Sequence, residues 1–139
     1  MLPLSDGGAL LSGSQSMSPN ARRDAWVARV DRNGKLVWSR SFGNNSGDFF
    51  FGARRSTDGR FELFGVGGYS TRNARPVQAL VVTLDEDGTA IKQQRFVQPV
   101  QELVGILPLL DSGYLLLGAS LGGPSLVKIN ADGSLIRPR

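Results

Sequence analysis

The sequence predicts an all-β protein made of three copies of one antiparallel unit, each copy containing four short strands. Two sequence landmarks recur three times, in the same order, along the 139 residues. No segment shows a sustained period of 3.6 residues, so we expect helix to be almost absent. Asn-Gly and Asp-Gly pairs lie between alternating apolar stretches, which is typical of tight hairpins. Together these observations indicate short strands joined by tight turns.

The first landmark is an acidic turn that leads into an apolar strand and then a glycine. It occupies residues 5–13, 57–65 and 110–118. The second landmark is an alternating strand that ends in another turn. It occupies residues 26–34, 80–88 and 126–133. Such a repeat indicates one supersecondary unit per copy, stacked on its neighbours.

Unit two is the complete copy and defines the four expected strands. These are residues 49–55, 61–69, 77–85 and 89–96. The Asp58-Gly59 and Asp87-Gly88 pairs supply the turns after the first and third strands, because such turns need a positive φ. The three units are expected to divide a single domain at about residues 1–47, 48–97 and 98–139.

Four antiparallel strands at a period of roughly 45–53 residues match the blades of a β-propeller. A propeller typically closes with four to eight blades. Three propeller-like blades therefore leave two apolar faces uncovered. We expect the chain to be half of a six-bladed propeller completed as a homodimer, or part of a longer propeller. An irregular, open β structure is the third alternative.

Unit one resembles a bacterial β-propeller repeat family with blades of the form SDGGYLLAGS…DAWLVKLDxNGxxxW…FGGSGxD. The matching residues are Ser5-Asp6-Gly7-Gly8, the run 24–34, Trp38, Phe42-Gly43 and Ser46-Gly47-Asp48. The resemblance covers almost the whole chain and is weakest in unit two, where Ile91 stands in the place of Trp38. It implies the propeller fold and a secreted, periplasmic or cell-surface location, although residues 1–12 lack the pattern of a signal peptide. It implies no single activity.

The composition argues against catalysis. Histidine and cysteine are absent, which removes thiol nucleophiles, imidazole bases and thiolate or imidazole metal ligands. The turns at 31–34, 85–88 and 130–133 look like fragments of a calcium loop, but no glutamate follows them. We interpret them as hairpins. We therefore expect no enzymatic activity, no cofactor and no metal site.

The net charge of +4, from 16 basic and 12 acidic residues, only weakly favours an anionic partner. The Arg54-Arg55 pair follows three phenylalanines, but no recognised nucleic-acid module accompanies it, so we expect no nucleic-acid partner. Phe49, Phe50 and Phe51 are expected at a buried strand edge or a contact between blades, and Trp26 and Trp38 between blades. No apolar stretch of about 18 residues is present, so no membrane span is expected.

The long loops between the second and third strands are the candidate binding site. The loops of units one and two, residues 16–24 and 70–76, both contain the sequence Asn-Ala-Arg. Equivalent loops of stacked repeats emerge on one face. The expected binding residues are Asn20, Arg22, Arg23, Arg72, Asn73 and Arg75. Arginine forks and amides suit carboxylates, phosphates and sugar hydroxyls. The sequence therefore predicts a non-catalytic module that binds a protein partner through these loops. A glycan-binding propeller and a purely structural segment of a larger propeller are the alternatives.

Overall fold

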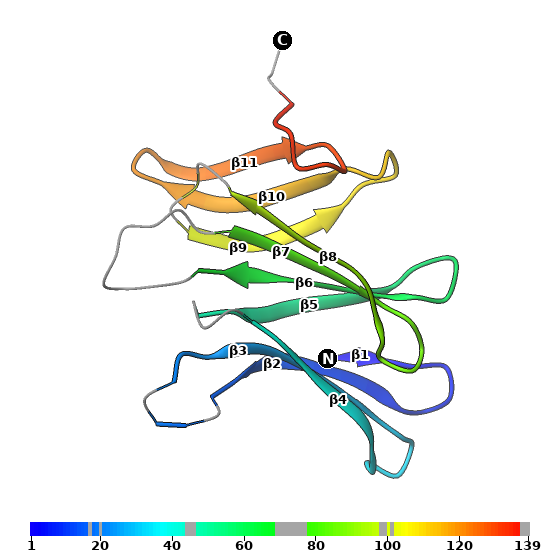
Figure 1. Ribbon diagram of the computed structural model, residues 1–139. Helices are drawn as coiled ribbons and strands as arrows, with labels where there is room; N and C mark the ends of the chain where they lie inside the picture. The colour runs from blue at the N-terminus through cyan, green and yellow to red at the C-terminus, as the bar shows by residue number, and fades with distance from the viewer. Residues whose placement is uncertain are drawn as a thin grey trace.

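The computed structural model describes residues 1–16, 18–19, 21–43, 47–68, 78–97, 100 and 102–136. Within these residues every helix or strand element is a strand, and the strands form three antiparallel sheets of four, four and three (Figure 1). The prediction of an all-β chain is therefore confirmed. In this part of the chain there is no helix with the length and apolar character needed to cross a bilayer.

Each sheet is a meander in which every strand pairs with the next strand in the sequence. The first sheet contains β1 (Leu2–Pro3), β2 (Ala9–Gln15), β3 (Asp24–Val30) and β4 (Leu36–Phe42). The second sheet contains β5 (Phe49–Arg55), β6 (Phe61–Gly67), β7 (Gln78–Leu84) and β8 (Ala90–Val97). The third sheet contains β9 (Glu102–Pro108), β10 (Tyr114–Ser120) and β11 (Gly123–Ile129).

The third sheet corrects the prediction of four strands in every unit. After β11, the turn at 130–134 reverses the chain. Pairing beyond it is limited to a bridge between Ile129 and Leu135 and a hydrogen bond from the Ile136 N–H to the Lys128 carbonyl (3.1 Å). So short a pairing does not form a strand. Among the described residues, β11 is therefore an edge strand, whereas the equivalent strands β3 and β7 each pair with a fourth strand.

The turns after the first and third strands share one geometry. After β3, the Asp31 N–H bonds the Lys35 carbonyl (2.8 Å), and the Gly34 N–H bonds the Asp31 carbonyl (3.0 Å). Gly34 has φ +80°. This is a three-residue hairpin loop, a type I turn followed by a left-handed residue. The positive φ falls on the glycine, while the Asp31 carboxylate accepts the Asn33 and Lys35 N–H groups, both at 2.9 Å.

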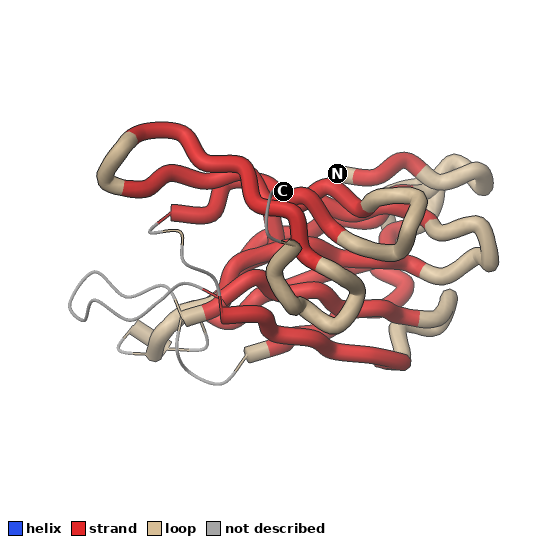
Figure 2. The backbone as a smooth tube through the Cα atoms, turned by 90° about the horizontal axis from the view of Figure 1, so that it is seen from above, coloured by secondary structure: helices blue, strands red, loops and turns tan. Residues whose placement is uncertain are grey.

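The meander places its connections at opposite ends of the sheets. Figures 1 and 2 show the short turns at one end, and the β2–β3 and β10–β11 connections at the other. This arrangement follows from antiparallel pairing, because every second connection returns to the same end. It separates the turn aspartates from the loop that was predicted to bind a partner.

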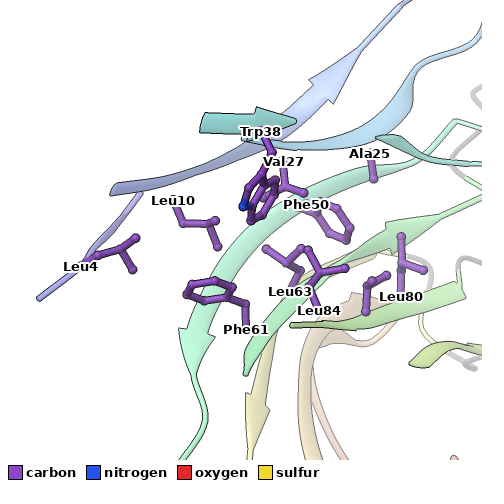
Figure 3. Close-up of a cluster of buried hydrophobic side chains, with 11 residues drawn as sticks. Leu4, Leu10, Ala25, Val27, Trp38, Phe50, Phe61, Leu63, Leu80 and Leu84 are labelled. Carbon is purple, nitrogen blue, oxygen red and sulfur yellow. The ribbon is translucent and has the colours of Figure 1, made fainter. Parts of the chain in front are cut away.

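The three sheets stack face to face, with the second sheet in the middle (Figure 1). The first interface is a buried apolar cluster, shown in Figure 3, in which Trp38 and Phe61 lie on facing sheets with ring centroids 6.5 Å apart. Its other members include Leu10, Ala25, Val27, Phe50, Leu63, Leu80, Val82 and Leu84. The second interface joins the other face of the middle sheet to the third sheet. It includes Phe64, Val66, Ala79, Val81, Phe96, Val100, Leu103, Tyr114, Leu116 and Ile129.

The middle sheet is buried on both faces, and its sequence reflects this. Phe61 and Leu63 of β6 face the first sheet, whereas Phe64 and Val66 face the third. A strand covered on both sides reads as a continuous apolar run rather than as an alternation. The same reason accounts for the three phenylalanines of β5, because Phe50 packs in the first interface while its two neighbours pack against the second.

Candidate functional site

Two of the six predicted binding residues, Arg22 and Arg23, are described by the structure. Both are exposed in the connection between β2 and β3. The Arg23 guanidinium donates to the Ser14 hydroxyl at 3.3 Å, and the Arg23 carbonyl accepts the Asp48 N–H at 2.8 Å. Arg23 also lines an open groove of about 550 Å³, together with Ser16, Ser18, Pro19 and Ala21. The remaining predicted residues, Asn20, Arg72, Asn73 and Arg75, lie outside the described residues.

The turn aspartates are occupied by their own turns. The Asp85 carboxylate accepts the N–H groups of Asp87 and Thr89, both at 2.9 Å. The Asp132 carboxylate accepts the Ser134 N–H at 2.9 Å. Such carboxylates stabilise the loop rather than presenting free ligands. Within the described ranges, no group of three or more metal-ligating side chains is arranged to hold an ion.

Two turn aspartates also form equivalent ion pairs with the third strand of their sheet. Asp6 pairs with Arg29 at 3.0 Å, and Asp111 pairs with Lys128 at 2.7 Å. The pKa of Asp6 is lowered, first by the hydrogen bond from the Gly8 N–H and then by Arg29. The pKa of Asp111 is lowered mainly by the hydrogen bond from Lys128. The two pairs therefore mark corresponding points on the first and third sheets.

A groove of about 610 Å³ lies between the second and third sheets, near the β5–β6 and β9–β10 turns. Four basic side chains line it. Three of them are in ion pairs: Arg54 with Glu62 (2.9 Å), Arg55 with Glu86, and Arg60 with Asp58 (3.5 Å). The aromatic residue in its lining, Tyr114, is buried, and burial raises the pKa of its hydroxyl. Most of the positive charge of the groove is thus neutralised within the protein.

A buried ion pair ties the middle sheet together and was missed by the sequence analysis. Asp48 is fully buried and pairs with Arg95 of β8, with Nη1 and Oδ1 2.9 Å apart. The same carboxylate accepts the Gly68 N–H at 3.2 Å. Asp48 lies outside both recurring landmarks, and no local signal identifies a partner 47 residues away. The pair joins the start of β5 to the end of β8 and has a structural role.

The outer face of the third sheet is apolar and exposed. Strand register places Leu107, Leu115, Leu117 and Leu126 on the face opposite Tyr114 and Leu116. Leu126 is 66% exposed, Leu107 is 57% exposed and Leu117 is 44% exposed. Val104, at the bulge of β9, is exposed as well. Side chains of this size are normally buried when they gather on one face of a sheet.

The outer face of the first sheet has a similar character. Leu11, Trp26 and Val30 lie on the face opposite Leu10 and Val27, and all three are half-buried. Leu36 of β4 pairs with Val30 and is 58% exposed. Trp26 was predicted to fill space between blades, and in the single chain it lies on this outer face. The two ends of the stack therefore both present apolar side chains, as the count of three units predicts.

Counting from the glycines of the repeat shows how the two outer faces are related. Val27 and Val81 occupy equivalent positions that face the following sheet, and Leu126 occupies the same position in the third sheet. Leu63 and Leu116 are equivalent and face the preceding sheet. The corresponding residue of the first sheet is Leu11. The outer face of the third sheet is thus equivalent to the faces that pack on the next sheet along the chain. The outer face of the first sheet is equivalent to the faces that pack on the sheet before.

Comparison with known proteins found no match for this chain, either among family models or among curated proteins.

Proposed function

We propose that this chain is a non-catalytic module that binds protein through the apolar outer faces of its end sheets. The supporting observation is the exposure of Leu107, Leu117 and Leu126 on one face of the third sheet. Contiguous apolar side chains on a surface mark interaction sites. A sheet face also provides a flat, pre-formed contact surface, so that little conformational entropy is lost on binding. That the three sheets are blades of a β-propeller is also part of this proposal.

The proposed surface differs from the loops that the sequence favoured. The turn aspartates bond their own backbone, and three of the four bases in the groove between sheets are paired. The absence of histidine and cysteine supports a role without catalysis. The apolar side chains of the two outer faces, in contrast, are covered by no sheet of the described chain.

The proposal is tested by placing a photo-crosslinking amino acid at Leu126 in cells that produce the protein. Irradiation is expected to give a covalent adduct with a protein. The matched control has the same amino acid at Leu121, which is 93% exposed in the β10–β11 turn and off the sheet face. No adduct at residue 126, or equal adducts at both positions, would contradict binding through this face.

A second candidate function, binding of an anionic protein segment, is favoured by the neighbouring arginines Arg22 and Arg23. Neither forms an ion pair with any residue that the structure describes. Replacing both with alanine is expected to weaken binding of an aspartate-rich peptide by about 10-fold and to reduce its salt dependence. The control is Arg32→Ala, in the exposed turn at the other end of the sheets. Equal affinity of both variants would count against the loop site.

A further inference from the structure

We infer that the protein partner of the end sheets is a second copy of this chain. The outer face of the third sheet of one copy docks on the outer face of the first sheet of the other, and the reverse contact closes the pair. This inference rests on the proposed function, because it requires the apolar faces to be binding surfaces. It assigns the partner and the way in which the two faces meet.

The chain itself contains the contact twice. In both internal interfaces, one sheet offers the face bearing Val27 or Val81, and the next sheet offers the face bearing Leu63 or Leu116. Stacking a third sheet on a first sheet would repeat this combination, with Leu126 in the place of the valines and Leu11 in the place of the buried leucines. The alternative contacts, third sheet on third sheet or first on first, have no precedent within the molecule.

Polar contacts at the first interface support the same arrangement. Arg29, held by Asp6, donates to the Glu86 carbonyl in the turn of the next sheet at 3.1 Å. Lys128, held by Asp111, occupies the equivalent position on the third sheet. The turn residue equivalent to Glu86 in the first sheet is Arg32. In the proposed pair, the Lys128 ammonium therefore lies within reach of the Arg32 carbonyl of the second copy.

The turn glycines show where a neighbouring sheet is missing. A Cβ atom at Gly88 would lie 2.8 Å from the ring of Trp38 in the preceding sheet, and one at Gly133 would overlap the ring of Phe96. At Gly34, the equivalent glycine of the first sheet, a Cβ would meet no atom within 4 Å. The first sheet thus has the same turn as its neighbours, but without a sheet packed against it.

The size of the faces favours a closed pair over an open chain of copies. Three strands about 4.8 Å apart, each with seven residues at about 3.3 Å, give a face of about 330 Å². A stable interface buries about 800 Å² on each partner. One contact falls well short of this value. Two contacts per copy approach it, because both end sheets are then covered.

The mass in solution tests this inference. At tens of micromolar, light scattering is expected to give twice the chain mass of 14.9 kDa. Leu126→Glu and Leu11→Glu, which alter the third and first sheets respectively, are each expected to raise the dissociation constant at least 10-fold, because each places an unpaired carboxylate at a position whose equivalents are buried in the internal interfaces. Leu121→Glu is the control and should retain the double mass. Circular dichroism of each variant verifies that the strands are intact.

Mixing the two variants discriminates between modes of docking. A pair formed from one Leu126→Glu chain and one Leu11→Glu chain has both substitutions in one contact and an unaltered second contact. The mixture is therefore expected to associate more tightly than either variant alone. If the first-sheet variant behaves as the unsubstituted protein, the faces meet in another combination and the inference is overturned.

Trp26 gives an independent signal because it lies on the face that the second copy would cover. Dilution from micromolar to nanomolar concentration is expected to shift the fluorescence emission to longer wavelength as Trp26 meets water. A monomeric mass at tens of micromolar would overturn the second copy as partner. A crosslink from residue 126 to a different protein, in that case, would leave the proposed binding function standing. Absence of any crosslink would remove both.

Discussion

Ser112 occupies a backbone conformation that glycine takes in the two equivalent turns. Its φ is +66°, and Gly7 and Gly59 have φ values of +86° and +84°. A residue with a side chain lowers the stability of the fold by about 1–2 kcal/mol when it adopts the left-handed region. Glycine adopts this region without steric cost, and lowers stability by only about 0.5–1 kcal/mol, because its unfolded chain has more conformational freedom to lose. The third sheet therefore contains a small local strain that the other two sheets avoid.

Replacing this serine tests the cost directly. Ser112→Gly is expected to raise the free energy of unfolding by about 1 kcal/mol, because the strain is relieved in a turn whose shape stays the same. The reciprocal change, Gly59→Ser, should lower it by a similar amount. Urea denaturation of both variants measures the two values. A lower midpoint for Ser112→Gly would contradict this account of the turn.

At the scale of single residues, the sequence predicts what is determined locally. The Asp-Gly and Asn-Gly turns were predictable because the aspartate bonds its own loop and the glycine supplies the positive φ within four residues. The Asp48–Arg95 pair was not, because the two residues meet only after β5 and β8 have taken their places in one sheet. The sequence did not show that only the glycine of each Asn-Gly or Asp-Gly pair has a positive φ, and that the residue before it does not.

Side chains of the fourth strand of each four-stranded sheet donate hydrogen bonds to the sheet that follows it. Trp38 of β4 donates from Nε1 to the Glu86 carbonyl at 3.0 Å, and Arg40 donates to the Asp87 carbonyl at 3.0 Å. Gln94 of β8 donates to the Ala131 carbonyl at 3.1 Å. In each case a side chain of one sheet satisfies a carbonyl in the turn between the third and fourth strand positions of the next.

Removal of the indole tests how much these contacts between sheets contribute to stability. Trp38→Ala is expected to lower the free energy of unfolding by about 3–5 kcal/mol, because it opens a cavity against Phe61 and Gly88 and leaves the Glu86 carbonyl without this donor. Leu36→Ala, on the same strand but exposed, should change it by less than about 0.5 kcal/mol. Chemical denaturation at low protein concentration, where any pair is dissociated, provides the comparison. Equal effects would show that the indole does not join the sheets.

At the scale of strands, the repeat predicted the meander well, and β5 (Phe49–Arg55) has the predicted bounds. The predicted ends at residues 69 and 77 lie outside the described residues. The predicted fourth strand of unit three is not found among the residues up to 136 that the structure describes there, because the hairpin signal at Asp132-Gly133 reports the turn and not the length of the strand after it. A turn of two or three residues can be specified locally, whereas a strand requires a partner along its whole length.

Charge and pH act on the molecule as a whole through its turns. Hydrogen bonds from the hydroxyls of Ser56 and Ser134 lower the pKa values of Asp58 and Asp132 below the ordinary 3.8. A carboxyl whose pKa is lowered by folding adds stability that is present above its unfolded pKa. That stability is lost as the pH falls through the folded value. Histidine, which titrates near neutrality, is absent.

The expected stability profile is therefore flat between pH 5 and 8 and falls below about pH 4. Urea midpoints measured from pH 7 to pH 2 give the profile. Asp111→Asn should have a lower midpoint at pH 7 and a smaller decrease on acidification, because this position then has no proton to gain. A steep change between pH 6 and 7 would contradict the assignment of the acid response to the turn carboxyls.

The burial of the second sheet on both faces has a dynamic consequence. Strands β6 and β7 pair on both edges and are covered above and below, so their amide groups meet water only when a neighbouring sheet separates. In the single chain, strands β2 and β10 have one open face and can fluctuate without such separation. Amide hydrogen exchange at low protein concentration, where any pair is dissociated, should therefore be slowest at the centre of β6 and β7, approaching the rate set by global unfolding, and faster toward both ends of the stack.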